Sequence, residues 1–116
     1  MNYADTGITA TITPSASSSK VLVMSACACK AEEDVYAAAN TRLLRGATVI
    51  AEAVKAVSSA STIDLSLVYQ VLDSPATTSA SVYKVQFCKE STNVGTVSVN
   101  SDGAKVSTIV LMEVAA

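Results

Sequence analysis

Apolar and polar residues alternate with a period of two along much of this chain, whereas the apolar period of an amphipathic helix is weak. In residues 7–13, isoleucine and alanine alternate with threonine. In residues 62–72, apolar side chains occupy one face and polar side chains the other, with Val68 as the exception. Because successive side chains of a strand point to opposite faces, this alternation predicts strands with one apolar face. The chain is therefore expected to be all-β.

Eight such segments follow one another at intervals of roughly ten residues, separated by turn residues. The predicted strands cover residues 7–13, 20–29, 41–45, 48–52, 62–72, 81–89, 96–100 and 107–114. Pro14 and the serines after it separate the first two strands, and Gly46 supplies the turn of a hairpin between the third and the fourth. This spacing predicts an antiparallel β-sandwich of about eight strands, jelly-roll-like in its connections.

Two stretches fit the strand pattern less well. Residues 30–39 are rich in alanine and acidic residues, which favour helix, but the stretch is short and has no sustained apolar face. We therefore predict a loop there, with room for one helical turn. Residues 51–60 suit a helix in isolation and a strand if the hairpin extends, and the sequence leaves both open.

Two of the predicted strands are apolar on both faces. Residues 21–24 form such a run in the second strand, and residues 109–112 form one in the last. A strand of this kind is expected to be covered on both sides. The first run is typical of a strand in the middle of a sandwich, and the second points to an oligomer.

The composition bounds the fold and removes several classes of function. A chain of 116 residues with 50% hydrophobic and 16% charged residues is expected to form one domain, residues 1–116. It has no histidine and no tryptophan, and so lacks the commonest general base, the commonest metal ligand and the best stacking residue. The net charge of −2, without a basic cluster, argues against nucleic-acid binding. No apolar run approaches the roughly 20 residues of a membrane span, and no secretion signal is recognised.

Cys27, Cys29 and Cys88 form an odd set in a chain too large to depend on disulfides, so thiols are expected. In a strand, Cys27 and Cys29 lie on one face, unlike the Cys-x-x-Cys turn of zinc sites and redox centres. A bridge from Cys88 to one of the pair, and a metal site, are the alternatives.

The sequence assigns no catalytic, cofactor-binding or metal-binding residue. Ser17 and Lys20 match the spacing of a Ser-x-x-Lys nucleophile, but that chemistry places the two residues one helical turn apart. Pro14 and the strand that follows make this segment extended instead. Carboxylate pairs for glycoside hydrolysis need not be close in sequence, and nothing in the chain points to one.

The acidic residues Glu32, Glu33 and Asp34 are consecutive in the predicted loop. They lack the alternating ligands and the glycine of a calcium-binding loop, and consecutive acids of this kind usually face water. Tyr36 is the one tyrosine placed in this loop rather than on an apolar strand face. These four residues are the candidate receptor contacts.

Three blocks of the sequence are distinctive together: YADTGITATITPSASSSKVLV at residues 3–23, LDSPATTSASVYKVQ at 72–86 and STIVLMEVAA at 107–116. They resemble the C-terminal domain of tail fibres and other virion structural proteins of tailed bacteriophages, particularly those of marine and cyanobacterial hosts. Between residues 25 and 62, only RLLRG at 42–46 and TVI at 48–50 follow the family pattern. Family members carry this block at the end of a longer protein, so we expect either a stand-alone version or an excised domain.

The resemblance implies a virion component, made in the host cytoplasm, that forms a homotrimer, contacts other virion proteins and is displayed at the particle surface. The first hypothesis is a non-enzymatic tail-fibre module whose loops bind a host surface glycan or protein. The second is a capsid decoration or cement protein. The third is a glycan-degrading enzyme, which the missing histidine disfavours. The resemblance implies no catalytic residue and no cofactor.

Overall fold

A computed structural model of the chain confirms the all-β class and the antiparallel two-sheet architecture. It describes residues 2–32, 37–57, 62–89, 96–100 and 106–116. In these residues eight strands form two antiparallel sheets, and there is no helix. The strands are β1 (Ala4–Ile12), β2 (Lys20–Glu32), β3 (Ala37–Arg45), β4 (Thr48–Val57), β5 (Thr62–Asp73), β6 (Ser81–Lys89), β7 (Thr96–Val99) and β8 (Thr108–Val114). The jelly-roll-like pattern of connections stays a prediction.

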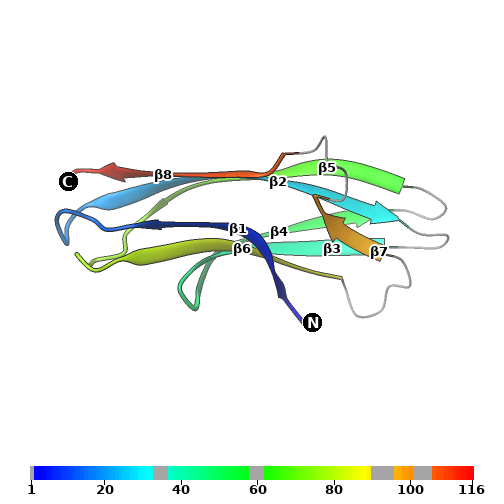
Figure 1. Cartoon of the computed structure of the whole chain (residues 1–116), viewed down its shortest axis with the longest axis horizontal. Helices are drawn as coiled ribbons and strands as arrows, with labels where there is room; N and C mark the ends of the chain where they lie inside the picture. The colour runs from blue at the N-terminus through cyan, green and yellow to red at the C-terminus, as the bar shows by residue number, and fades with distance from the viewer. Residues whose placement is uncertain (1, 33–36, 58–61, 90–95, 101–105) are drawn as a thin grey trace.

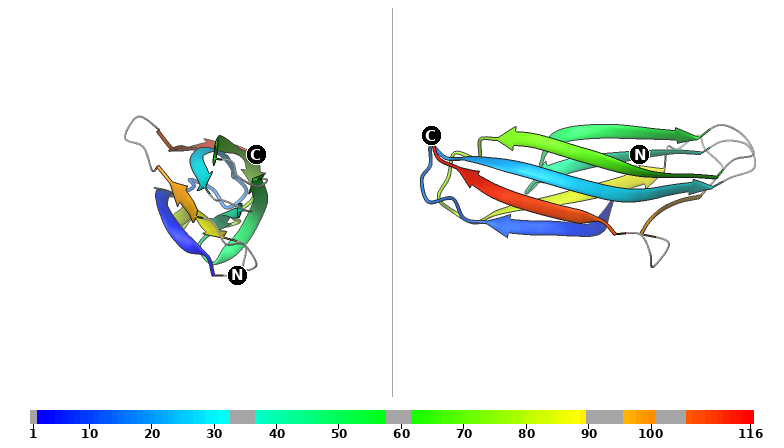
Figure 2. Two further views of the ribbon diagram at one scale, coloured as in Figure 1. Left: turned by 90° about the vertical axis from the view of Figure 1, so that its right-hand side faces the viewer. Right: turned by 90° about the horizontal axis from the view of Figure 1, so that it is seen from above.

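The two sheets pack face to face, with their strands along the 50 Å long axis of the molecule (Figures 1 and 2). The first sheet has the strand order β1-β6-β3-β4. In the second sheet β2 is central, and β5 pairs along one of its edges. Its other edge is shared end to end, since β8 pairs with residues 20–26 and β7 with residues 29–32. The second sheet is thus organised around β2.

The predicted hairpin is confirmed as β3 and β4, which pair along their whole lengths. Gly46 in the turn has a φ of 57°, a backbone conformation that glycine adopts without a steric penalty. Its amide donates a hydrogen bond to the Val82 carbonyl at 2.8 Å. The turn is therefore held against the start of β6.

The loop predicted over residues 30–39 is wrong at both ends, because β2 continues to Glu32 and β3 already begins at Ala37. Residues 29–32 pair with β5 on one side and with β7 on the other. This pairing satisfies backbone groups that a short helix would have to satisfy within itself. Residues 33–36 lie outside the described residues. Residues 51–57, which the sequence left open, form strand β4, and 58–60 lie outside the described residues.

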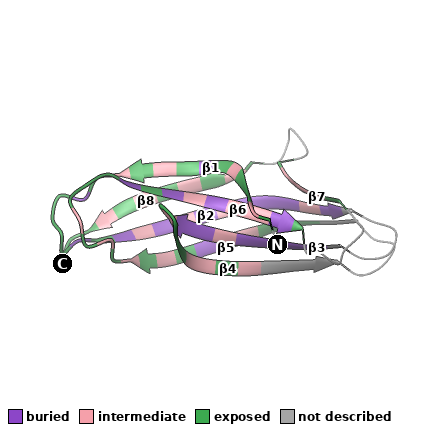
Figure 3. Cartoon of the chain, turned by 90° about the horizontal axis from the view of Figure 1, so that it is seen from below, coloured by how far each residue is buried: buried purple, intermediate pink, exposed green. Residues whose placement is uncertain are grey.

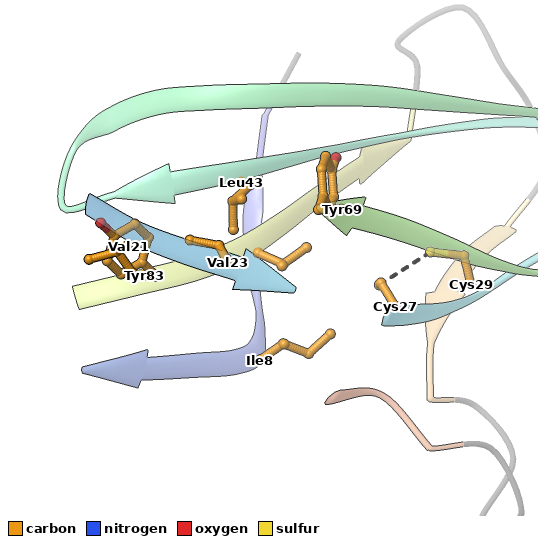
Figure 4. Close-up of a cluster of buried hydrophobic side chains, with 9 residues drawn as sticks. Ile8, Val21, Val23, Cys27, Cys29, Leu43, Tyr69 and Tyr83 are labelled. Atoms are coloured by element: carbon orange, nitrogen blue, oxygen red, sulfur yellow. Dashed lines mark hydrogen bonds between the residues drawn. The ribbon is translucent and has the colours of Figure 1, made fainter. Parts of the chain in front are cut away.

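The core lies between the sheets and is built mainly from inward-facing side chains of β2, β3 and β6 (Figure 3). Val21, Val23 and Leu43 are fully buried and lie in one cluster with Tyr83 (Figure 4). β5 contributes its predicted apolar face at Leu67, Tyr69 and Val71, which pack against this cluster. Leu65, predicted on the same face, is instead 45% exposed.

Two polar links join the sheets across the core. The hydroxyl groups of Thr41 in β3 and Tyr69 in β5 lie 2.7 Å apart and are buried. Nearer the end of the sandwich, Arg45 Nη1 donates to both carboxylate oxygens of Asp73, at 2.7 and 2.6 Å. The Tyr83 hydroxyl donates to Asp73 Oδ2 at 2.7 Å. These bonds set the position of β5 relative to β3 and β6.

Candidate functional site

Only one of the four candidate receptor contacts lies within the described residues. Glu32 is the last residue of β2, and its backbone pairs with β5 and with β7. It therefore belongs to a strand and not to the predicted loop. Glu33, Asp34 and Tyr36 lie outside the described residues, and their role stays a prediction.

The outer face of the second sheet carries apolar side chains in register. Leu72, Leu22 and Met112 form one row across β5, β2 and β8. Two outward-facing rows further along, Val68 lies beside Ala26. The surface that we call the apolar face consists of Leu22, Met24, Ala26, Val68, Leu72, Val110, Met112 and Val114.

A single chain leaves much of the apolar face in contact with water. The exposed fractions are 69% for Val68, 52% for Leu72, 51% for Met112, 49% for Val110 and 37% for Val114. Single exposed apolar side chains are ordinary on protein surfaces, whereas a contiguous exposed patch marks a contact surface. The alignment of these side chains in adjacent rows makes them one patch.

Charged residues border the apolar face and do not cross it. Lys20 lies beside Val114 at one end, and Lys30 lies opposite Asp64 at the other. The four rows between these ends contain no charged side chain, and their polar members are Gln70, Thr108 and Ser66. A charge-poor centre with a polar border is the usual composition of a protein–protein interface.

Two features of the sequence indicate this surface. Val68 breaks the alternation of residues 62–72, and in the structure it is the most exposed member of the apolar face. The run at residues 109–112 is apolar on both sides: Ile109 and Leu111 pack against the core, whereas Val110 and Met112 are exposed. The expected cover on both sides of β8 is therefore present on the inner side alone within the described chain.

The outer face of the first sheet, in contrast, carries a group of linked polar and charged side chains. Arg42 Nε donates to Gln86 Oε1 at 2.9 Å, and Gln86 Nε2 donates to Asp5 Oδ1 at 2.8 Å. Lys84 Nζ lies 3.3 Å from the same Asp5 oxygen. The guanidinium of Arg42 stacks over the Tyr3 ring, 3.9 Å from its centre. We call these five residues the polar network. Hydrogen bonds from Gln86 and Lys84 hold the pKa of the Asp5 carboxyl below its usual range.

The three cysteines are buried thiols. Cys27 and Cys29 point into the core with their sulfur atoms 3.4 Å apart, which confirms that they share one strand face (Figure 4). Cys88 alternates with the core residues Tyr83 and Val85 along β6, so it faces the outer side of the first sheet. A bridge between Cys88 and the other two is therefore excluded, because the first sheet lies between them.

Within the described ranges, no group of three or more acidic or cysteine side chains is placed to hold a metal ion. The same residues include no helix long and apolar enough to cross a membrane. Neither a scan against protein-family models nor a search of curated proteins finds a match to this chain.

Proposed function

We propose that this chain is a non-enzymatic structural module of a tailed-phage virion, of the tail-fibre type, which assembles as a homotrimer and is exposed for host receptor binding. The observation that carries the proposal is the apolar face, which needs a partner to cover it. The virion setting and the number of subunits rest on the three sequence blocks described above.

Further copies of the same chain are the partner that best fits the apolar face. Its central rows carry no charge, so there is no charge pattern that would select a different partner. Symmetric assembly brings the same apolar surface of each copy to a common contact. In the trimer, three second sheets pack around the symmetry axis, and the outer faces of the first sheets, with the polar network, point to solvent.

The free energy available from this contact is substantial. Fully burying a valine, leucine or methionine side chain contributes about 1.5–3 kcal/mol. The exposed fractions of the five most exposed members of the face lie between 37% and 69%. Covering what remains of these five contributes about 5 kcal/mol for each chain. Val68 retains the largest exposed fraction, so a charge placed there should weaken the contact strongly.

The test of assembly is the mass of the chain in solution by light scattering after size-exclusion chromatography. We expect three times the chain mass of 11.9 kDa, and a shift towards the monomer in Val68→Asp. Val49→Asp is the matched control, because Val49 is 40% exposed on β4 and lies outside the apolar face. A monomeric wild-type chain, or equal masses for the two variants, contradicts assembly through this face.

The test of the virion setting is gold labelling of particles with antibodies against the chain. Label on tail fibres supports the proposal, and label spread over the capsid supports the decoration protein instead. Absence of the chain from purified particles refutes both. Receptor binding is tested separately by adding the folded oligomer to host cells, where it should bind saturably.

A further inference from the structure

Cys27 and Cys29 bring two thiols into contact on the inner face of β2. Their sulfur atoms lie 3.4 Å apart, and both side chains are buried (Figure 4). Two residues of extended strand span about 6.4–6.8 Å, which is the upper end of the Cα separations of about 4.4–6.8 Å found in disulfides. A disulfide between these two cysteines therefore requires only a small contraction of β2.

The second edge of β2 is irregular at Ala28, between the two cysteines. The ladder with β8 ends at Ala26, and the ladder with β7 begins at Cys29. Between them, the Ala28 amide donates to Ser107 Oγ at 2.9 Å, and the Ala28 carbonyl accepts from the Asn100 amide at 3.0 Å. A contraction of β2 at Ala28 therefore acts on the two hydrogen bonds that join this strand to the residues flanking β7 and β8.

Cys29 lies closer than Cys27 to a route from solvent. Its neighbour in β5 is Leu65, which is 45% exposed. Its neighbour on the other side is Val99 in β7, a strand of four residues that pairs with β2 alone among the described strands. A short edge strand of this kind opens locally at a low cost in free energy. Cys27 lies instead beside Leu67, which packs against the core.

We infer that Cys27 and Cys29 form a reversible oxidation site for hydrogen peroxide, and that their disulfide loosens β7 from β2. The Cys29 thiolate attacks the peroxide, becomes a sulfenic acid and releases hydroxide. The Cys27 thiol then attacks the Cys29 sulfur, so that the disulfide forms and water leaves. Overall, the two thiols lose two hydrogen atoms, and the peroxide is reduced to two molecules of water. The site rests on the described residues alone and does not require a virion setting.

The experiment counts thiols in the full chain after brief treatment with equimolar hydrogen peroxide. The chain is then unfolded, alkylated with N-ethylmaleimide and digested with trypsin, which cuts after Lys20 and Lys30. The peptide of residues 21–30 holds both cysteines, so it should take up two maleimides before oxidation, none after it, and two again after dithiothreitol. Cys88 is the internal control, because the first sheet separates it from the other thiols, and it should take up one maleimide throughout.

The order of the two steps is tested with dimedone, which traps sulfenic acids. Cys27→Ser removes the thiol that closes the disulfide, so the sulfenic acid should accumulate at Cys29. Cys29→Ser should react with dimedone at least tenfold more slowly, because Cys27 is the better covered thiol. Cys88→Ser is the matched control and should oxidise like wild type.

The effect on the fold is tested by amide hydrogen exchange in the reduced and oxidised wild-type chain. The Asn100 amide should exchange at least tenfold faster after oxidation, because its acceptor is the Ala28 carbonyl, and the amides of β8 should be unchanged. The inference is overturned if the peptide of residues 21–30 still takes up two maleimides after peroxide, or if Asn100 exchanges equally fast in both states. Equal dimedone labelling of the Cys27→Ser and Cys29→Ser variants overturns the assignment of Cys29 as the attacking thiol.

Discussion

Replacing Asp73 by alanine tests how the two sheets are joined near one end of the sandwich. Asp73 ends β5 in the second sheet, and its carboxylate accepts hydrogen bonds from Arg45 and from Tyr83 in the first. The Asp73 side chain is 11% exposed and that of Arg45 is 27% exposed, whereas Tyr83 is fully buried. Removing the carboxylate therefore leaves one partly buried cation and one buried hydroxyl without their hydrogen-bond acceptor.

The size of the effect follows from these exposures. Breaking a buried ion pair by removing one partner costs about 3–5 kcal/mol, whereas an exposed pair contributes about 1 kcal/mol or less. Arg45 is partly exposed and lies between these limits, so we assign about 2 kcal/mol to its loss of a partner. An unsatisfied buried hydroxyl adds about 1 kcal/mol. Asp73→Ala should thus lower the free energy of unfolding by about 3 kcal/mol.

The assay is urea unfolding followed by circular dichroism, at one fixed chain concentration because assembly contributes to stability. Tyr83→Phe removes the hydroxyl alone, and combining it with Asp73→Ala completes a cycle in which the two losses should be less than additive. Asp5→Ala is the control, since this carboxylate is 62% exposed on the outer face of the first sheet. A loss below about 1 kcal/mol in Asp73→Ala would refute the reasoning.

Two further predictions concern pH. Hydrogen bonds from the Ser15 hydroxyl and amide, both 2.7 Å from Glu113 Oε1, lower the pKa of that carboxyl. A carboxyl whose pKa is lower in the folded state stabilises the fold at pH values above its unfolded-state pKa, and this contribution is lost on acidification. Glu113→Gln should therefore lose less stability than wild type between roughly pH 5 and pH 3 in urea unfolding. Burial raises the pKa of Tyr69 to about 12, so ultraviolet titration should show this tyrosine ionising far above the ordinary value, and stability should fall as the pH rises past 10. Thr41→Val leaves the Tyr69 hydroxyl without its partner and should lower the free energy of unfolding by about 1–2 kcal/mol, whereas an unchanged value would contradict a structural role for this bond.

Alternation along the chain was sufficient to place most strands. The pattern of residues 62–72 predicts β5, and the Gly46 turn predicts the β3–β4 hairpin, because side-chain direction in a strand and the φ preference of glycine are local properties. Residues 30–39 were misassigned for the complementary reason. The local preference of alanine and glutamate for helix was outweighed by pairing with β5 and β7, which are distant in sequence.

The candidate surfaces were harder to predict than the strands. Arg42, Lys84 and Asp5 come from three separate strands, and no spacing in the sequence relates them. The structure brings them together because β6 pairs with β1 on one side and with β3 on the other. The acidic loop was the alternative that the sequence offered, since consecutive charges are visible without knowledge of pairing.

The sequence by itself determined that this protein is built from strands, that two of them are apolar on both faces, and that it lacks histidine and tryptophan. Only the tertiary structure decided which strands are neighbours. That choice aligned Val68, Leu72, Val110 and Met112 into one apolar face, and it gathered the polar network on the opposite side of the sandwich. The physical reason is that side-chain alternation is set within each strand, whereas a surface is set by register between strands, which depends on contacts far apart along the chain.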